Sequence, residues 1–253
     1  MTTLTYIFHS CFVAETGDAM VVFDYWKDNE RQEARQLLAR ANKPVYAVVS
    51  HFHPDHYNPV VLQWAQQGKA RLLLSYDVAK RRRADTAMPA AILRPGHTYE
   101  DEHIRLRAFR STDIGVSVGI TLGDGTTLFH CGDLNNWRFD DPEEDAARLK
   151  VTQRQMEGMY LAAVREVAAA YPAIDHLMFP LDPRLGRNAT RGARQWLERM
   201  PVRHFHPMHF WNLYPQMRES LSELQKDFPA TLFHLPADSP LNHSGAMEFI
   251  TSL

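Results

Sequence analysis

The most informative stretch of this sequence reads His51-Phe52-His53-Pro54-Asp55-His56. It follows the apolar run Val45-Tyr46-Ala47-Val48-Val49, which predicts a buried strand. On an extended segment, residues two apart face the same way, so His51 and His53 can point at one metal ion. Pro54 disfavours a helix through the stretch, and a turn after it would direct Asp55 and His56 towards a second ion.

The donor types in this stretch indicate a metal centre. Imidazole and carboxylate ligands suit zinc, manganese or iron. Two such ions about 3.5–4 Å apart can hold a bridging hydroxide and clamp a hydrolytic transition state. The alternative is a surface loop that holds three histidines and an aspartate by chance, and it accounts poorly for this spacing after a buried strand.

Two later segments can supply further ligands. Leu128-Phe129-His130-Cys131-Gly132-Asp133 reads as a strand ending in Gly-Asp, whose carboxylate could enter a cleft and bridge two ions. By itself, Gly-Asp is more often a turn. Phe205-His206-Pro207-Met208-His209-Phe210-Trp211 also reads as a strand with a late histidine, and His209 could close the second site. Judged alone, that segment is an aromatic core strand with one satisfied histidine.

The composition is that of a soluble globular protein. Of 253 residues, 45% are hydrophobic and 23% are charged, and no stretch resembles a linker or a repeat, so we expect one domain over residues 1–253. The net charge of -2 argues against a protein that binds nucleic acid through a basic surface.

The compartment can also be inferred from the sequence. Two cysteines are too few for a disulfide framework and fit a reducing compartment. The N-terminus has no signal-peptide pattern, and no apolar stretch approaches the roughly 20 residues needed to cross a bilayer. These features predict a cytoplasmic protein without a membrane partner.

Periodicity and turn signals predict a mixture of strands and helices. Helices are expected at 28–41, 58–67, 142–170, 189–199 and 213–226. Strands are expected within the first 25 residues, at 45–49, 71–75, several times within 91–130, and at 177–180, 203–206, 231–234 and 246–250. Two sheets back to back with helices outside accommodate this order.

The ligand pattern resembles the metallo-β-lactamase-fold hydrolases: His-x-His-x-Asp-His, then Gly-Asp at a strand end, then a late histidine. Phe8-His9-Ser10-Cys11-Phe12-Val13-Ala14-Glu15 with Val22-Phe23-Asp24 is similar to the opening hairpin of the branch that includes ascorbate-6-phosphate lactonase-like proteins. A bacterial subgroup of that branch resembles this chain at 111–117, 130–137 and 180–184. The resemblance extends from about Tyr6 to Trp211.

The resemblance implies an α/β (α+β) fold, a four-layer αββα sandwich with the metal cleft at one edge. It implies that His51 and His53 bind the first ion and that Asp133 bridges both ions. The second ion would be held by Asp55, His56 and His209. The implied activity is metal-dependent hydrolysis, in which Asp55 positions the attacking hydroxide and accepts its proton.

One position departs from the family pattern. The place of a further first-site histidine falls on Asp113, so Asp113 is the ligand or another group, such as His103 or water, fills the position. An aspartate ligand would tilt metal preference from zinc towards manganese or iron. The departure also leaves open a site with one ion.

Other residues have two readings each. His9 contacts the substrate or is a packed hairpin histidine, and Asp24 supports the ligand loop by hydrogen bonding. Arg184 binds an anionic substrate group or forms a structural salt bridge with Asp182. Trp137, Phe210 and Trp211 wall the cleft or belong to the core. No spacing argument assigns a role to His97, His176, His204, His206, His234 and His243.

The leading hypothesis is a hydrolase that cleaves an ester, lactone, amide or phosphoester bond in a small, anionic metabolite. One alternative is a phosphodiesterase on RNA or nucleotides, which needs a basic track beside the cleft. Another is a non-catalytic metal-binding sensor, in which the change at Asp113 has disabled the first site. The sequence leaves homo-oligomerisation open.

Overall fold

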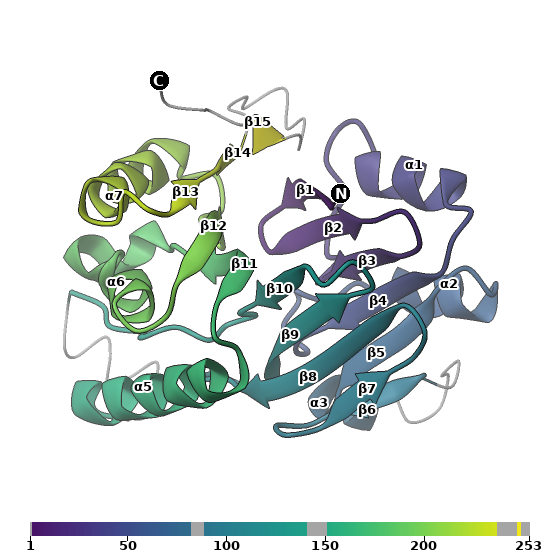
Figure 1. Ribbon diagram of the computed structural model, residues 1–253, viewed down its shortest axis with the longest axis horizontal. Helices are drawn as coiled ribbons and strands as arrows, with labels where there is room; N and C mark the ends of the chain where they lie inside the picture. The colour runs from purple at the N-terminus through teal and green to yellow at the C-terminus, as the bar shows by residue number, and fades with distance from the viewer. Residues whose placement is uncertain (1, 82–88, 141–150, 237–246, 249–253) are drawn as a thin grey trace.

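The computed structural model describes residues 2–81, 89–140, 151–236 and 247–248. Two sheets pack face to face, and helices cover their outer faces (Figure 1). The four-layer αββα arrangement predicted from the sequence is therefore confirmed.

The first sheet has six strands in sequence order. They are β1 (Thr3–Phe8), β2 (Cys11–Glu15), β3 (Met20–Phe23), β4 (Val45–Val49), β5 (Arg71–Ser75) and β6 (Ala91–Leu93). Strands β1 to β3 pair antiparallel, and β3 to β6 pair parallel. The turn between β2 and β3 is closed by Thr16, whose backbone N–H donates to Ala19 O at 2.9 Å.

The second sheet has seven strands in the order β13-β12-β11-β10-β9-β8-β7. They are β7 (Thr98–Glu100), β8 (Ile104–Arg110), β9 (Val116–Leu122), β10 (Thr127–His130), β11 (Ile174–Pro180), β12 (Val202–Met208) and β13 (Leu232–Phe233). Strands β7 to β10 pair antiparallel, and β10 to β13 pair parallel. A separate antiparallel pair consists of β14 (Leu235–Pro236) and β15 (Met247–Glu248).

The helices divide between the two outer faces (Figure 1). On the first sheet lie α1 (Glu33–Arg40), α2 (Val60–Gln66) and α3 (Tyr76–Arg81); on the second lie α5 (Gln153–Ala170), α6 (Arg191–Leu197), α7 (Tyr214–Asp227) and the short 3₁₀ helix η1 (Pro183–Asn188). Helix α1 begins later than predicted because Asp28 and Asn29 cap it; Asp28 Oδ1 accepts from Ala34 N at 3.0 Å. A capping box at Thr152 and Gln155 begins α5. The predicted start at 142 lies outside the described residues.

Strand β4 shows how the sandwich is filled. All five of its residues are buried, as expected for a parallel strand covered on both faces. Tyr46 and Val48 belong to the core between the sheets, whereas Val45, Ala47 and Val49 pack towards the helices. Directly after this apolar strand come buried imidazole side chains, which mark the position of the candidate site.

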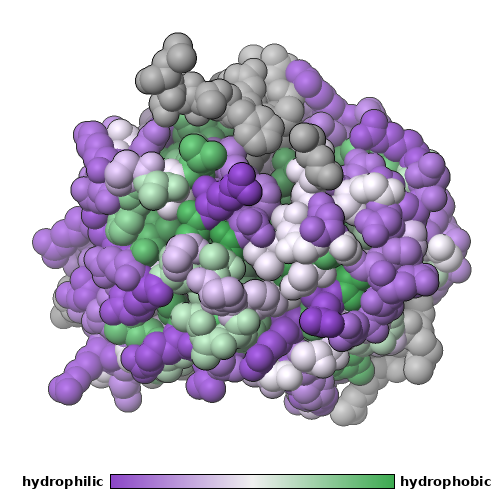
Figure 2. Space-filling view, in the orientation of Figure 1, coloured by the Kyte–Doolittle hydropathy of each residue, from purple (hydrophilic) through white to green (hydrophobic). Residues whose placement is uncertain are grey.

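Hydrophilic side chains form most of the rim of the face seen in Figure 2, with hydrophobic ones as smaller patches between them. None of the helices within the described ranges is both long and apolar enough to span a bilayer.

Candidate metal centre

The candidate site lies where parallel strands end. The stretch His51–His56 follows β4, Asp24 follows β3, Asp133 follows β10 and His209 follows β12. Carboxyl ends of parallel strands meet at one edge of a sheet, and ligands in open α/β sheets bind there. Two loops complete the site: the β1–β2 turn, which carries His9, and the loop before β9, which carries Asp113.

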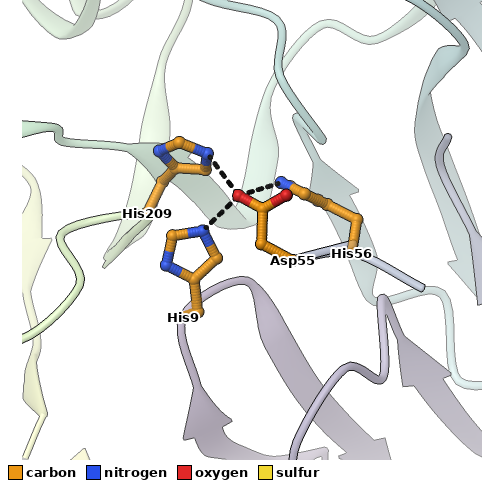
Figure 3. A group of neighbouring side chains, drawn as sticks. All are labelled: His9, Asp55, His56 and His209. Atoms are coloured by element: carbon orange, nitrogen blue, oxygen red, sulfur yellow. Dashed lines mark ion pairs between the residues drawn. The ribbon is translucent and has the colours of Figure 1, made fainter. Parts of the chain in front are cut away.

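Four side chains form what we call the inner group: His9, Asp55, His56 and His209. Their candidate ligand atoms all lie within 4.8 Å of one another. Asp55 Oδ2 lies 3.2 Å from His9 Nε2, 3.7 Å from His209 Nε2 and 3.9 Å from His56 Nε2 (Figure 3). The three histidines are buried and approach this carboxylate from different elements.

The outer group consists of His51, His53, Asp113 and Asp133, whose candidate ligand atoms satisfy the same 4.8 Å limit. His51 Nε2 lies 3.1 Å from His53 Nδ1, and Asp113 Oδ2 lies 3.5 Å from His53 Nδ1. The side chains of His53 and Asp113 are 42% and 39% exposed. Half of this group therefore faces solvent, while His51 and Asp133 are buried.

Asp133 lies between the two groups. Its Oδ1 is 3.1 Å from His56 Nε2 and 3.4 Å from His209 Nε2. Its Oδ2 is 3.3 Å from His51 Nε2 and 4.0 Å from His53 Nδ1. Each oxygen thus faces a different group, which is the arrangement that a bridging carboxylate requires.

Buried carboxylates orient two of the imidazoles from behind. Asp24 Oδ2 accepts from His56 Nδ1 at 2.7 Å, and Asp182 Oδ2 accepts from His209 Nδ1 at 2.9 Å. Because a carboxylate only accepts, Nδ1 of each ring carries a proton, so in the neutral ring that would bind a metal the Nε2 lone pair faces the site. Asp24 therefore has the supporting role predicted from the sequence.

Ser50 orients His51 in the same way. Its hydroxyl donates to Asp24 Oδ2 at 2.6 Å, so it accepts from His51 Nδ1, which lies 2.9 Å away. The lone pair of His51 Nε2 then faces Asp133. The sequence analysis missed Ser50, and the only signal was its place directly before the first histidine.

The lone pairs provide a test of whether a metal fits. As neutral rings, His56 and His209 each direct an Nε2 lone pair at Asp133 Oδ1, an arrangement that is repulsive unless a proton or a metal ion lies between them. Within the described residues, no hydrogen bond satisfies His56 Nε2, His209 Nε2 or Asp133 Oδ1, although all three are buried. Both ring nitrogens of His9 are likewise buried and make no hydrogen bond to a described residue. This donor set fits divalent transition metals.

The charges of the site shift its pKa values strongly. Burial raises the pKa of Asp55, but the nearby imidazoles of His9, His56 and His209 favour its ionised form more strongly and hold that pKa well below its usual range. Burial also raises the pKa of Asp133, and the neighbouring histidines again lower it further than that. Burial lowers the pKa of His9 to about 4. Both carboxylates are therefore ionised and His9 is neutral at neutral pH, as metal ligands must be.

Backbone strain is concentrated at the site. His9, Asp24 and His209 have positive φ angles of 56°, 42° and 62°, a conformation that costs about 1–3 kcal/mol per non-glycine residue. The two histidine turns are tied together, since His209 N donates to His9 O at 3.1 Å. Gly115 has a φ of 76°, and a Cβ there would lie 2.5 Å from His51 Cβ, so only glycine lets the Asp113 loop pack this closely.

His130, also missed by the sequence analysis, connects two ligand loops. Its Nδ1 accepts from Gly132 N at 3.1 Å, so its Nε2 carries the proton and donates to Ser10 O at 2.8 Å. The ring is buried and stacks on Phe23 with centroids 5.0 Å apart. His130 therefore holds the turn of His9 against the turn of Asp133.

A cleft of about 400 Å³ opens over the site, a size that suits a small-molecule ligand. Its lining residues are His53, Asp55, Asp113, Asp133, Trp137, Phe139, Arg184, His209 and Trp211. Of the two readings left open for the aromatic residues, Trp137 and Trp211 wall the cleft, whereas Phe210 belongs to the core. Its ring is buried and stacks on Tyr6, with centroids 5.6 Å apart, because it points into the core.

Arg184 forms the salt bridge with Asp182 that the sequence analysis considered, and it also lines the cleft. Its Nε donates to Asp182 at 3.0 Å, which forms the structural salt bridge. The side chain is nevertheless 39% exposed and lines the cleft, with its guanidinium 5.1 Å from the centre of a Trp211 ring.

The structure distinguishes between Asp113 and His103, the two residues considered for the position that differs from the family pattern. Asp113 lies in the outer group. His103 pairs with Glu102 at 3.1 Å in the β7–β8 turn and belongs to none of the ligand groups found among the described residues. His9, expected to contact substrate or pack in the hairpin, lies among the ligand-type side chains of the inner group.

Comparison with known sequences identifies the family of this chain. A sequence profile described as "Beta-lactamase superfamily domain" matches residues 3–175. A search of curated proteins gives no match.

Several solved structures are similar in fold. Igni18, a metallo hydrolase from Ignicoccus hospitalis, has a TM-score of 0.65 at 14% identity, covering 98% of this chain and 97% of its own. A possible metal-dependent hydrolase from Veillonella parvula has a TM-score of 0.60 at 12% identity, covering 99% and 100%. CmlA, a diiron β-hydroxylase from Streptomyces venezuelae, has a TM-score of 0.58 at 13% identity, covering 89% and 51%. At these identities the likeness shows the fold alone.

Proposed function

Since this chain belongs to the beta-lactamase superfamily, we propose that it is a metal-dependent hydrolase acting on a small, anionic metabolite. One observation carries the proposal: the two oxygens of Asp133 face separate groups of imidazole and carboxylate ligands. Such a shared carboxylate is what a two-metal hydrolytic site needs.

The candidate ligands would hold two separate ions. His51, His53 and Asp113 would hold one ion, while Asp55, His56 and His209 would hold the other, with Asp133 shared. When bound, paired zinc, manganese or iron ions would supply a hydroxide nucleophile and offset negative charge on the substrate oxygen. The oxygen-rich outer group favours manganese or iron over zinc.

Asp55 is the catalytic residue in this proposal. Its carboxylate borders both the inner group and the cleft and is 19% exposed. Because its low pKa keeps it ionised at neutral pH, it can accept a hydrogen bond from the attacking water and orient it. It is also placed to accept the proton of that water, which is the role expected from the sequence.

The cleft supports a small substrate with an ester, lactone, amide or phosphoester bond. Among its described lining residues, Arg184 alone has a permanently cationic side chain, so the cleft has no basic track of the kind that RNA binding requires. Its aromatic walls suit an apolar body next to one anionic group.

Metal content tests the proposal directly. We expect purified protein to hold at least one, and up to two, equivalents of zinc, manganese or iron by elemental analysis. Chelation should remove hydrolysis of aryl esters, lactones and phosphoesters and lower the melting temperature; adding back one metal should restore both. A protein that binds no metal after reconstitution contradicts the proposal. Metal binding without turnover of any such bond would favour the sensor hypothesis.

Arg184 provides a second prediction, about substrate charge. Replacing it with methionine should raise KM for an anionic ester about 10–100-fold, since a hydrogen bond to a charged group contributes about 1.5–3 kcal/mol. A neutral ester with the same leaving group should change far less. Steady-state kinetics on the matched pair measures the difference, and unchanged metal content shows that Asp182 still orients His209. An equal rise in KM for both esters would mean that Arg184 affects activity only through its salt bridge with Asp182.

A further inference from the structure

The inner and outer groups differ in three ways that bear on metal affinity. In the inner group, the side chains of His9, His56 and His209 are at most 4% exposed. In the outer group, His53 and Asp113 are 42% and 39% exposed. Water competes with protein ligands in the outer group but hardly reaches the three imidazoles of the inner group.

His9 gives the inner group one imidazole more than the sequence analysis expected. Its buried ring lies against His209, with centroids 4.3 Å apart, and its Nε2 is 3.2 Å from Asp55 Oδ2. Neither ring nitrogen makes a hydrogen bond to a described residue. A buried imidazole in this condition, aimed at a carboxylate and two other imidazoles, has the environment of a metal ligand rather than of a packing residue.

Buried carboxylates support two imidazoles of the inner group, whereas in the outer group the comparable support, from Ser50, reaches only His51. Asp24 and Asp182 orient His56 and His209, and the His209 N to His9 O hydrogen bond joins the two turns. Outer-shell contacts of this kind change metal affinity about 10–100-fold. On the outer side, Asp113 belongs to an irregular loop between β8 and β9.

We propose that the two groups bind metal unequally: the inner group binds first and tightly with His9 as a ligand, and the outer group binds weakly and exchanges its ion with solvent. This inference rests on the proposed function. With Asp133 shared, the inner ion has three imidazoles and two carboxylates around it. The outer group has one imidazole fewer, and its residues His53, Asp113 and Asp133 line the cleft through which substrate would enter.

The experiment is a zinc titration of metal-stripped full-length protein in competition with a chromophoric chelator. We expect a tight first equivalent and a second at least about tenfold weaker. His9→Ala should weaken the tight phase at least about tenfold and leave the weak phase nearly unchanged. Asp113→Ala should remove only the weak phase. His97→Ala changes an exposed histidine outside both groups and should leave both phases intact.

The outcomes are distinguishable. Two equivalents of equal affinity, or a tight phase that survives in folded His9→Ala protein, would overturn the inference and leave the proposed function standing. If His9→Ala does not fold, the Asp113→Ala titration still decides, because loss of the tight phase there would reverse the order of the groups. Absence of zinc binding to the unsubstituted protein would overturn both proposals.

Discussion

Asp133→Ala is expected to lower kcat/KM more than about 100-fold and to remove at least one equivalent of metal. The reason is that both candidate ions would lose the same ligand, since Oδ1 faces His56 and His209 while Oδ2 faces His51. Loss of merely outer-shell partners already costs about 10–100-fold. Elemental analysis and steady-state kinetics on one aryl ester measure both effects.

The matched control is Asp124→Ala, which removes a carboxylate from the β9–β10 turn outside the site. It should leave metal content and kinetics unchanged. An Asp133→Ala protein that keeps both its metal and its activity would show that Asp133 does not bridge. Asp133→Asn separates charge from shape, because the amide keeps the volume and one carbonyl oxygen but lacks the negative charge.

The second prediction concerns acid stability and a cluster of four histidines outside the site: His176, His204, His206 and His234. Parallel pairing of β11 with β12 places His176 beside His204. His176 Nδ1 lies 3.0 Å from His206 Nε2, and His204 Nδ1 lies 2.9 Å from His234 Nε2. In each pair one facing nitrogen must carry a proton and the other must not, so protonation of both rings would break the hydrogen bond.

Burial keeps this cluster uncharged. It lowers the pKa of His176 and of His234 to about 4 and that of His206 well below its usual value, and the neighbouring rings add to the effect. Nearby Asp175 raises and Arg203 lowers the pKa of His176 and His204, but burial dominates. Between about pH 6.5 and 4 the unfolded chain therefore binds more protons than the folded one. The free energy of unfolding must fall as pH drops through this range.

We expect the free energy of unfolding of metal-stripped protein to fall by roughly 2 kcal/mol for each fully buried imidazole ring between pH 7 and about pH 5. The double variant His176→Leu/His206→Leu replaces one hydrogen-bonded pair by apolar groups. Its free energy of unfolding should fall clearly less between these pH values than that of the unsubstituted protein. Urea unfolding at the two pH values measures this. His97→Leu, at an exposed histidine, should behave like the unsubstituted chain, and the titrating site ligands are common to all three proteins. Parallel losses in all three would contradict the prediction.

Local pattern was enough to predict the elements that carry the site. The apolar run Val45–Val49 and the turn residues after it place His51 and His53 at a strand end. Both histidines can face the same way because side chains two apart on an extended segment point in one direction. The helix predicted at 213–226 appears as Tyr214–Asp227, and the strand at 71–75 as Arg71–Ser75. The helix predicted to begin at 28 begins at Glu33 because side-chain caps compete with helix formation there.

Several features depended on contacts between distant segments. His9 joins the inner group because the β1–β2 turn packs against the end of β12, 200 residues further along the chain. Whether Asp113 or His103 faces the site was settled by how the loop before β9 packs against His51, through Gly115. Phe210 turned into the core although its neighbours His209 and Trp211 face the cleft.

The sequence by itself determined the fold class, the order of the strands and helices, and the types of ligand atom, because periodicity and donor chemistry are properties of short segments. Tertiary structure alone decided which ligands share a group, how deeply each group is buried, and that four histidines without any sequence pattern meet on β11, on β12 and directly after β13. Strand register and loop packing set those distances, and both result from interactions between residues far apart in the chain.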